Sequence, residues 1–430
     1  MPLRLAASDA GFSVEFDAFL DRRRDNGQDV AGVVAGIIAD VRERGDAAVV
    51  DYTKKFDRLD VSDGLRIGAD RIAAARAACP ADQLRALQIA ATRIRAFHER
   101  QKPGGFSYTD ADGVHLGARW TPVSAVGIYV PGGTAAYPSS VLMNAIPAAV
   151  AGVTRVVMAV PTPDGEINPL VLAAADLAGV TEIYRIGGAQ AVAALAYGTA
   201  SISPVDKITG PGNAYVAEAK RQVFGVVGID MIAGPSEILV VADGANDPSW
   251  IAADLLSQAE HDASAQSILI ADSATFADAV VAAAERHLVT LPRAEIARRS
   301  WEANGAVILV DDLADAVALI DRIAPEHLEL AVENPEALAD RVSHAGAIFL
   351  GRHTPEAIGD YVAGPNHVLP TDRSARFSSG LGVADFMKRT TLVSCDAGAL
   401  SRIGPAAVTL ADAEGLGAHA LSVSIRLEGS

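Results

Sequence analysis

Residues 123–133 read VSAVGIYVPGG and decide the fold, because an apolar run there ends in a proline and two glycines. A short apolar run that is closed by a glycine turn and followed by a helical pattern is typical of a buried strand in a parallel sheet. The pattern returns at residues 182–188, EIYRIGG, and at residues 206–212, DKITGPG. This alternation predicts an α/β domain with a parallel sheet over residues 123–235.

A second alternation of strands and helices follows the first. Asp247 and Pro248 form a typical helix N-terminus, so a helix is predicted from there to about His261. Strands are expected at residues 238–242, 267–271, 306–310, 328–332 and 347–350. The chain therefore contains two sheet domains.

The flanking segments are less regular. Residues 30–56 and 81–100 carry apolar residues at helical spacing, and the chain beyond residue 380 loosens into a tail too short for a core of its own. This tail either packs on a partner subunit, which predicts a dimer, or folds back on its own chain. We expect two Rossmann-like domains with parallel-sheet βαβ units, divided into an N-terminal segment at 1–25, a main α/β domain at 26–122 and 236–380, a second domain at 123–235 and a tail at 381–430.

Charge and cysteine content limit the function classes. The 430-residue chain has a formal net charge of −17, and such a field repels nucleic acid. Cys79 and Cys395 are isolated, so neither a disulfide framework nor a cysteine metal site is expected. No apolar stretch is long enough to span a bilayer and no signal peptide is apparent, so we expect a cytoplasmic protein without a membrane partner.

Two pairs of residues could carry chemistry. Gln258 and His261 lie three apart on a predicted helix, share one face and offer atoms that zinc accepts. Glu326 and His327 stand where a helix gives way to a strand, and a carboxylate beside an imidazole can move a proton. The residues alone leave a solvated helix end and an exposed loop pair as open alternatives.

Two further groups are less specific. Asp360 and His367 lie among glycines and a proline, a composition that suits a metal or polar ligand site and equally a plain turn. Glu414 and His419 lie in the tail, where a histidine is normally a surface residue. They gain interest only if the tail reaches an active site.

The glycine turns after the strands favour a nucleotide. Ligands of parallel α/β sheets bind at the carboxyl ends of the strands, and the helix N-termini that follow favour phosphate. The G-x-G-x-x-G fingerprint and the P-loop are both missing. Composition and spacing thus predict an α/β enzyme with a candidate dinucleotide site and a candidate His/Asp metal site.

Taken together, several separate strings in the chain resemble the histidinol dehydrogenase family. They occur in the family's order and extend to the C-terminal part: 128–138 IYVPGGTAAYP, 209–215 TGPGNAY, 233–237 AGPSE, 254–262 DLLSQAEHD, 324–330 APEHLEL, 359–371 GDYVAGPNHVLPT and 377–388. The resemblance implies a zinc- and NAD-dependent enzyme that oxidises L-histidinol through an aldehyde to L-histidine. It also implies a homodimer in which the tail crosses to the neighbouring subunit and completes a shared site.

The resemblance also assigns roles to residues. One Zn²⁺ per subunit would be bound by Gln258, His261, Asp360 and His419, and the acid–base pair would be Glu326 and His327. NAD would be contacted by Tyr129, Gln190 and Asn213. The substrate would be contacted by Ser236, Gln258, His261, His327, Asp360, His367, Glu414 and His419.

The sequence is also compatible with three rival functions. A related zinc and NAD dehydrogenase could oxidise another small alcohol such as a hydroxylated sulfonate, although Glu326, Glu414 and His367 suit a cationic, imidazole-bearing substrate better. A nucleotide-binding regulatory protein could keep the fold without the chemistry. A zinc hydrolase would fit the ligands but would leave the glycine turns unexplained.

Overall fold

The computed structural model describes residues 1–22, 30–132, 137–232 and 234–428. Gly133 of the first glycine turn, Ala233 of the AGPSE string and the expected boundary near residue 25 lie outside the described residues. Among the described residues, no helix is both long and apolar enough to cross a membrane.

The strands predicted over residues 123–235 form one parallel sheet. Its order is β6-β5-β4-β7-β8, so the chain starts in the middle, moves to one edge and returns across the first strand to the other. The bounds are β4 (Ala125–Tyr129), β5 (Arg155–Ala159), β6 (Glu182–Tyr184), β7 (Lys207–Thr209) and β8 (Gly228–Ile229). The order reverses between β4 and β7, which is the switch point where ligands of such sheets bind.

Helices cover both faces of this sheet. One face is covered by α2 (Ala31–Arg44), α3 (Asp46–Asp57), α8 (Gly188–Tyr197) and α9 (Ala214–Val223). The other is covered by α4 (Ala69–Ala78), α5 (Ala81–Glu99), α6 (Pro138–Ala151) and α7 (Pro169–Ala178). The short 3-10 turn η2 (Pro163–Gly165) precedes α7.

The packing of α2 to α5 corrects the expected domain division. The helices expected within the domain of residues 236–380 lie with the five-stranded sheet instead, because α2 packs with α8 and α9 while α4 and α5 pack with α7 and α6. Helical spacing shows that a helix has an apolar face, but it does not tell which sheet covers that face. The helix expected over residues 30–56 is also divided in two at Gly45, whose φ is +57°.

The second alternation forms a six-stranded parallel sheet of order β1-β11-β10-β9-β12-β13. Its strands are β1 (Leu3–Ala6), β9 (Glu237–Ala242), β10 (Gln266–Ala271), β11 (Ala306–Leu309), β12 (His327–Ala331) and β13 (Ala347–Leu350). The five strands predicted from sequence are confirmed. The N-terminal segment is not separate from them, because β1 pairs with β11 at the edge of the sheet.

This sheet is also covered on both faces. Buried side chains of α10 (Pro248–Ala259), α11 (Ala274–His287) and α12 (Ala294–Asn304) pack on one face. Those of α1 (Phe12–Arg22), α13 (Ala316–Ile323) and α14 (Pro335–Ala339) pack on the other. Asp247 caps α10 by accepting a hydrogen bond from Ser249 N, with Pro248 at the first position as predicted.

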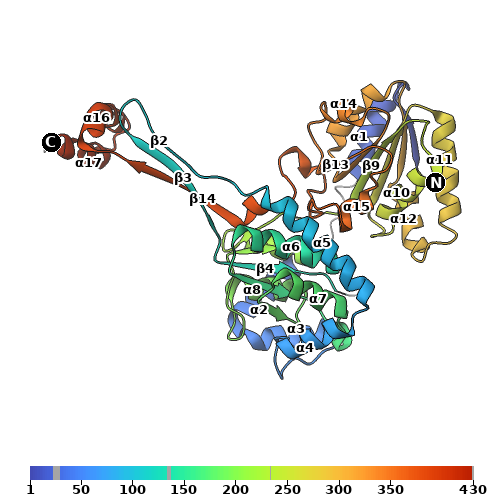
Figure 1. Cartoon of the computed structure of the whole chain (residues 1–430), viewed down its shortest axis with the longest axis horizontal. Coiled ribbons are helices and arrows are strands. Elements are labelled where there is room, and N and C mark those ends of the chain that lie inside the picture. The colour runs from blue at the N-terminus through green and yellow to red at the C-terminus, as the bar shows by residue number, and fades with distance from the viewer. Residues whose placement is uncertain (23–29, 133–136, 233, 429–430) are drawn as a thin grey trace.

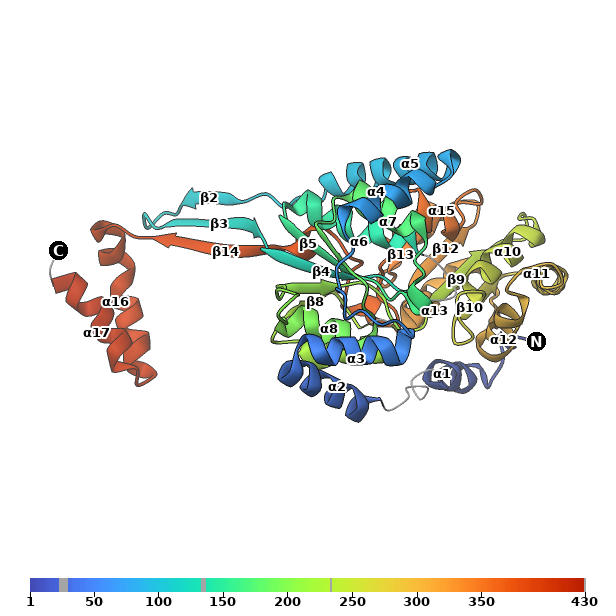
Figure 2. The same cartoon turned by 90° about the horizontal axis from the view of Figure 1, so that it is seen from below.

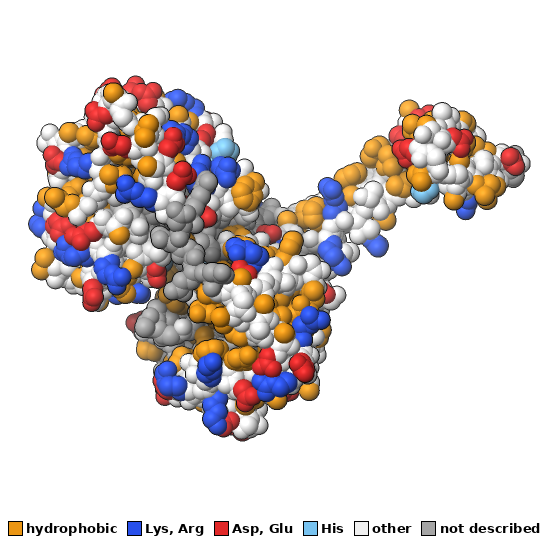
Figure 3. Space-filling view, turned by 180° about the vertical axis from the view of Figure 1, so that it is seen from behind, with side chains coloured by type: hydrophobic (Ala, Val, Ile, Leu, Met, Phe, Trp, Pro, Cys, Tyr) orange, Lys and Arg blue, Asp and Glu red, His pale blue; other side chains and the backbone are white. Residues whose placement is uncertain are grey.

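An arm leaves the two sheet domains (Figures 1 and 2). Its stem is an antiparallel ribbon of order β14-β3-β2, and its tip is a pair of packed helices. The elements are β2 (Phe106–Thr109), β3 (His115–Pro122), β14 (Met387–Ser394), α16 (Ala397–Ala413) and α17 (Gly417–Glu428). Figure 3 shows the arm as a narrow projection that carries hydrophobic and basic side chains.

The segment between β13 and the arm returns to the first domain. It contains α15 (Glu356–Tyr361) and the turns η4 (Ser374–Arg376) and η5 (Val383–Phe386). Leu381, Val383 and Phe386 pack in the core between the five-stranded sheet and α4 to α7. The chain therefore crosses between the two domains soon after Asp360 and His367, two of the residues expected to contact the substrate.

Candidate active site

Most of the residues expected to act on the substrate meet at the amino-terminal edge of the six-stranded sheet. His327 is the first residue of β12, and Ser236 directly precedes β9. Gln258 and His261 lie at the end of α10, which returns from the carboxyl edge of the sheet to its amino edge between parallel β9 and β10. Open parallel sheets usually bind ligands at the opposite edge.

The contacts of His327 fix its tautomer. Its buried ring donates a hydrogen bond from Nδ1 to the backbone oxygen of Glu237, at 2.9 Å. Nε2 therefore carries no proton in the neutral ring, and it has no hydrogen-bond partner among the described residues. Burial lowers the pKa of His327, which keeps the ring neutral at neutral pH. Such an imidazole can accept a proton at Nε2.

Glu326 is held next to His327 by a reciprocal contact with Glu237. Glu237 N donates to Glu326 Oε2 at 2.9 Å, and Glu326 N donates to Glu237 Oε2 at 3.4 Å. Asp372 N donates to the other oxygen of the Glu237 carboxylate, Oε1, at 2.8 Å. Both carboxylates are buried, so these bonds fix the start of β12 against the start of β9.

Asp360 and His367 lie on the other side of His327. The Asp360 Oδ1 atom is 3.9 Å from His327 Nε2 and 3.9 Å from His367 Nδ1. His367 Nδ1 donates to the backbone oxygen of Asp360 at 3.0 Å, and Ser140 Oγ on α6 lies 3.4 Å from His367 Nε2. Burial lowers the pKa of His367. The two sequence-predicted residues are therefore brought together with His327.

Gln258 provides the test of whether a metal suits this place. Its side chain is 0% exposed, and neither amide atom has a hydrogen-bond partner among the described residues. A buried amide without partners is costly unless a ligand engages it. His261 is exposed beyond the end of α10, yet close enough to His327 and His367 to influence both electrostatically. An amide oxygen, an imidazole and the Asp360 carboxylate are ligands that Zn²⁺ accepts.

Glu356 is a site residue that sequence reasoning missed. Its Oε1 lies 3.6 Å from His327 Nδ1, and His327, Glu356 and Asp360 offer ligand atoms that all lie within 4.8 Å of one another. Burial first, then the charge of Asp360, raises the pKa of Glu356 well above its usual value. The four-residue spacing of Glu356 and Asp360 places both on one face of α15, but it does not show that this face is buried.

Glu414 and His419 do not join this site within one chain. Both are exposed in the helical tip of the arm, at the far end of the ribbon from the sheet domains (Figure 1). The expected ligand set is thus divided between the sheet domains and the arm.

The residues expected to contact NAD lie at the carboxyl ends of the five-stranded sheet. Tyr129 ends β4 and is buried, and its hydroxyl accepts a hydrogen bond from Gly188 N at 3.0 Å. Gln190 is buried on α8, and its Oε1 has no partner among the described residues. The Asn213 side chain caps α9 by accepting from Tyr215 N and Val216 N. An unpaired amide oxygen beside glycine turns and a capped helix N-terminus suits a dinucleotide.

Comparisons with known proteins show the family to which the chain belongs. The sequence profile of the family described as Histidinol dehydrogenase matches residues 20–427. Proteins named histidinol dehydrogenase from Rhodospirillum rubrum and Rhizobium meliloti are 69% and 63% identical, and each alignment covers 99% of this chain and 99% of the relative. The crystal structure of histidinol dehydrogenase from Elizabethkingia anophelis superposes with a TM-score of 0.95 at 38% identity, over 100% of this chain and 98% of that chain. The chain therefore belongs to the histidinol dehydrogenase family.

Proposed function

We propose that this chain oxidises L-histidinol to L-histidine through the aldehyde at the amino edge of the six-stranded sheet, with two NAD molecules reduced in turn. Membership of the family makes the chain an NAD-dependent oxidoreductase of the last step of histidine biosynthesis. The observation that carries the assignment of the site is the unpartnered Nε2 of buried His327, 3.9 Å from Asp360 Oδ1.

His327 acts as the base of the first oxidation. Its Nδ1 proton is committed to the Glu237 carbonyl, so Nε2 takes the hydroxyl proton of the substrate as hydride leaves the carbinol carbon for NAD. The lowered pKa keeps this nitrogen unprotonated before the reaction.

Glu326 serves the second oxidation. Its carboxylate is fixed by Glu237 N beside the imidazole, where it can help a water molecule to add to the aldehyde. The resulting hydrate would give a hydride to the second NAD and a hydroxyl proton to solvent, and would leave as the carboxylic acid.

Gln258, His261 and Asp360 would hold one Zn²⁺ with His419 of the partner subunit. A zinc ion held there would supply a Lewis acid that anchors the imidazole and amino nitrogens of the substrate. The orphaned amide of Gln258 supports this set, and the carboxylate of Glu356 borders it. Asp360, His327, His367 and Ser236 would contact the substrate from the same chain.

We assign the arm to the interface of a homodimer. Its helical tip leaves apolar side chains exposed, including Leu410, Leu421 and Ile425, which a partner subunit would cover. In that dimer Glu414 and His419 complete the neighbouring site. The NAD contacts are assigned to Tyr129, Gln190 and Asn213 at the glycine turns.

The test couples metal analysis to turnover. Purified protein should contain about one zinc per chain and form two NADH per L-histidinol consumed, with little NADH from a sulfonated diol. Preference for the diol would move the function to the related alcohol dehydrogenases. Absence of NAD binding in calorimetry would favour a hydrolase. A protein without bound zinc and without turnover on any alcohol would favour the regulatory role.

A further inference from the structure

We propose that a buried ion pair, Lys220 with Asp230, positions the glycine turn at residues 210–213 for NAD. The inference rests on the proposed function in one respect, namely that NAD binds at the glycine turns. It adds two positioning residues that lie behind the turn and do not touch the cofactor themselves.

The pair forms hydrogen bonds with both backbone groups of one residue of the turn, Gly210. Lys220 on α9 and Asp230 just after β8 form an ion pair in which the side chains are only 2% and 1% exposed. Gly210 N donates to Asp230 Oδ2 at 2.7 Å, and Lys220 Nζ donates to Gly210 O at 3.0 Å. Both backbone groups of Gly210 are therefore fixed by charged side chains.

Gly210 has a conformation that needs such support. Its φ is +114°, and a Cβ at this position would lie 2.1 Å from the backbone oxygen of Tyr129. The turn thus lies directly against β4 at the switch point of the sheet, and it leads through Pro211 and Gly212 to Asn213, which caps α9. Tyr129 and Asn213 are both assigned NAD contacts, so a shift of Gly210 displaces one relative to the other.

Stability alone is a weak reason for burying two charges here. Removing a carboxylate and an ammonium from water costs several kcal/mol per ion, and an apolar pair of similar volume often does as well or better. What an apolar pair cannot supply is a donor for Gly210 O and an acceptor for Gly210 N. The hydrogen bonds to the turn are therefore the feature that distinguishes this pair from ordinary core packing.

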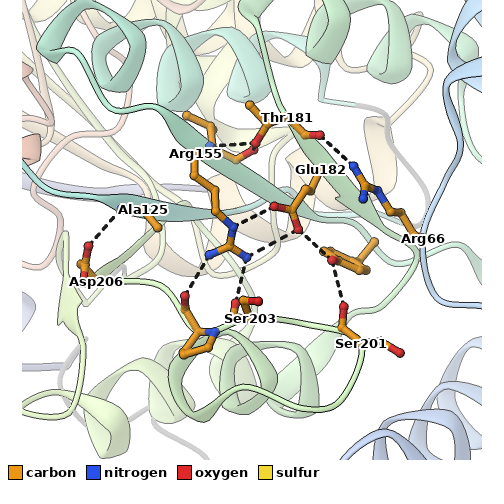
Figure 4. Close-up of polar contacts among 11 residues, drawn as sticks. Arg66, Ala125, Arg155, Thr181, Glu182, Ser201, Ser203 and Asp206 are labelled. Atoms are coloured by element: carbon orange, nitrogen blue, oxygen red, sulfur yellow. Dashed lines mark hydrogen bonds and ion pairs between the residues drawn. The ribbon is translucent and has the colours of Figure 1, made fainter.

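The same sheet offers a matched control at its opposite end. Arg155 and Glu182, at the amino ends of β5 and β6, pair at 2.7 Å and are partly buried, and Arg155 also binds the backbone oxygens of Ser203 and Pro204 (Figure 4). This control pair fixes a loop as well, but a loop remote from the glycine turns.

The experiment compares two charge-free double variants with the wild-type holoenzyme. Lys220→Met/Asp230→Asn leaves no unpaired buried charge, so its Tm should stay near that of the wild type, while Gly210 O loses its donor. We expect the Kd for NAD in calorimetry and the KM for NAD to rise about tenfold. The KM for histidinol and the zinc content should not change. Arg155→Met/Glu182→Gln should leave the Kd for NAD unchanged whatever its Tm.

The outcomes distinguish failure of the proposed function from failure of the positioning role. If the wild type binds no NAD, the proposed function fails and this inference with it. If the wild type binds NAD and the Lys220/Asp230 double variant binds it equally well, or the control weakens NAD equally, the positioning role alone is overturned. Should the double variant not fold, Lys220→Met alone decides the question, because it removes the donor to Gly210 O. At one fixed NAD concentration, the Tm increase produced by NAD should be smaller than in the wild type, and an equal increase would count against the role.

Discussion

At the scale of single residues, the contact of one ring nitrogen of His327 decides which nitrogen is free to accept a proton. Because Nδ1 is engaged by the Glu237 carbonyl, the ring presents Nε2 to the site. Replacing His327 by Gln should lower kcat by about 10²–10⁴-fold while zinc content and Tm remain near wild type, since general-base catalysis contributes on that scale. Steady-state NADH formation and metal analysis would measure both effects. His287→Gln on α11, where the ring bonds to Ser249 away from the site, is the matched control.

The burial of His327 also predicts the direction in which activity and stability change with pH. Burial lowers the pKa of His327, so kcat/KM for histidinol should stay on its plateau below the ordinary histidine value of about 6.5 and fall only at lower pH. The folded-state pKa lies below that of the unfolded chain. Between the two values the unfolded chain alone binds the proton, so the free energy of unfolding falls as pH drops through this window. An acid limb centred above pH 6.5 in the rate profile would remove His327 as the base.

Individual residues also show where sequence reasoning stops. Gln258, His327 and Asp360 lie on three separate elements, and only the family resemblance placed them at one site. Glu356 carried no such mark, because a glutamate near a helix start reads as a surface charge. Its burial depends on β12 and α10, which are distant in sequence, and no local pattern encodes that.

At the scale of elements, the turn after β7 leaves no room for a side chain at Gly210. Gly210→Ala would place a Cβ 2.1 Å from the Tyr129 oxygen, so we expect the turn to move, Tm to fall and NAD binding to be lost. Gly179→Ala at the end of α7 is the comparison, because that glycine also has a positive φ, +82°, but nothing within 4 Å of the added atom. It should cost about 1–3 kcal/mol of stability and leave the Kd for NAD unchanged. Equal NAD affinity in both variants would contradict this reading of the turn.

Strands that are buried along their length were predicted from their apolar sequence, whereas exposed strands were not predicted. Strands such as β9 and β10 are buried along their whole length, and an apolar run announces them. Every residue of β2 is exposed, and β14 is exposed along most of its length, so no buried apolar run marks either segment as a strand. β1 has four residues and pairs with β11, some 300 positions away. Only the tertiary partner makes these segments strands.

At the scale of the whole molecule, the proposed reaction needs the carboxyl edge of the five-stranded sheet to face the amino edge of the six-stranded sheet. The residues proposed to contact NAD lie at the carboxyl ends of one sheet, whereas His327 lies at the amino end of a strand in the other. Contacts between His367 and Ser140 on α6, and between Gly234 N and Thr371 Oγ1 at 2.6 Å, tie the segments that connect the domains. The proposed hydride transfer would require this apposition.

The same scale decides whether the arm completes a neighbouring site. A His261→Ala chain and a His419→Ala chain should each be nearly inactive alone. In a mixed dimer with a crossing arm, one site lacks both histidines and the other lacks neither. Co-expression with two affinity tags gives about half mixed dimers for random pairing, so the unfractionated mixture should regain about one quarter of wild-type activity. Doubly purified mixed dimers should regain about half. If those dimers form and stay inactive, His419 does not bind zinc in the partner's site. The fourth zinc ligand would then lie within the same chain, where Glu356 is a candidate because it lies close to Asp360.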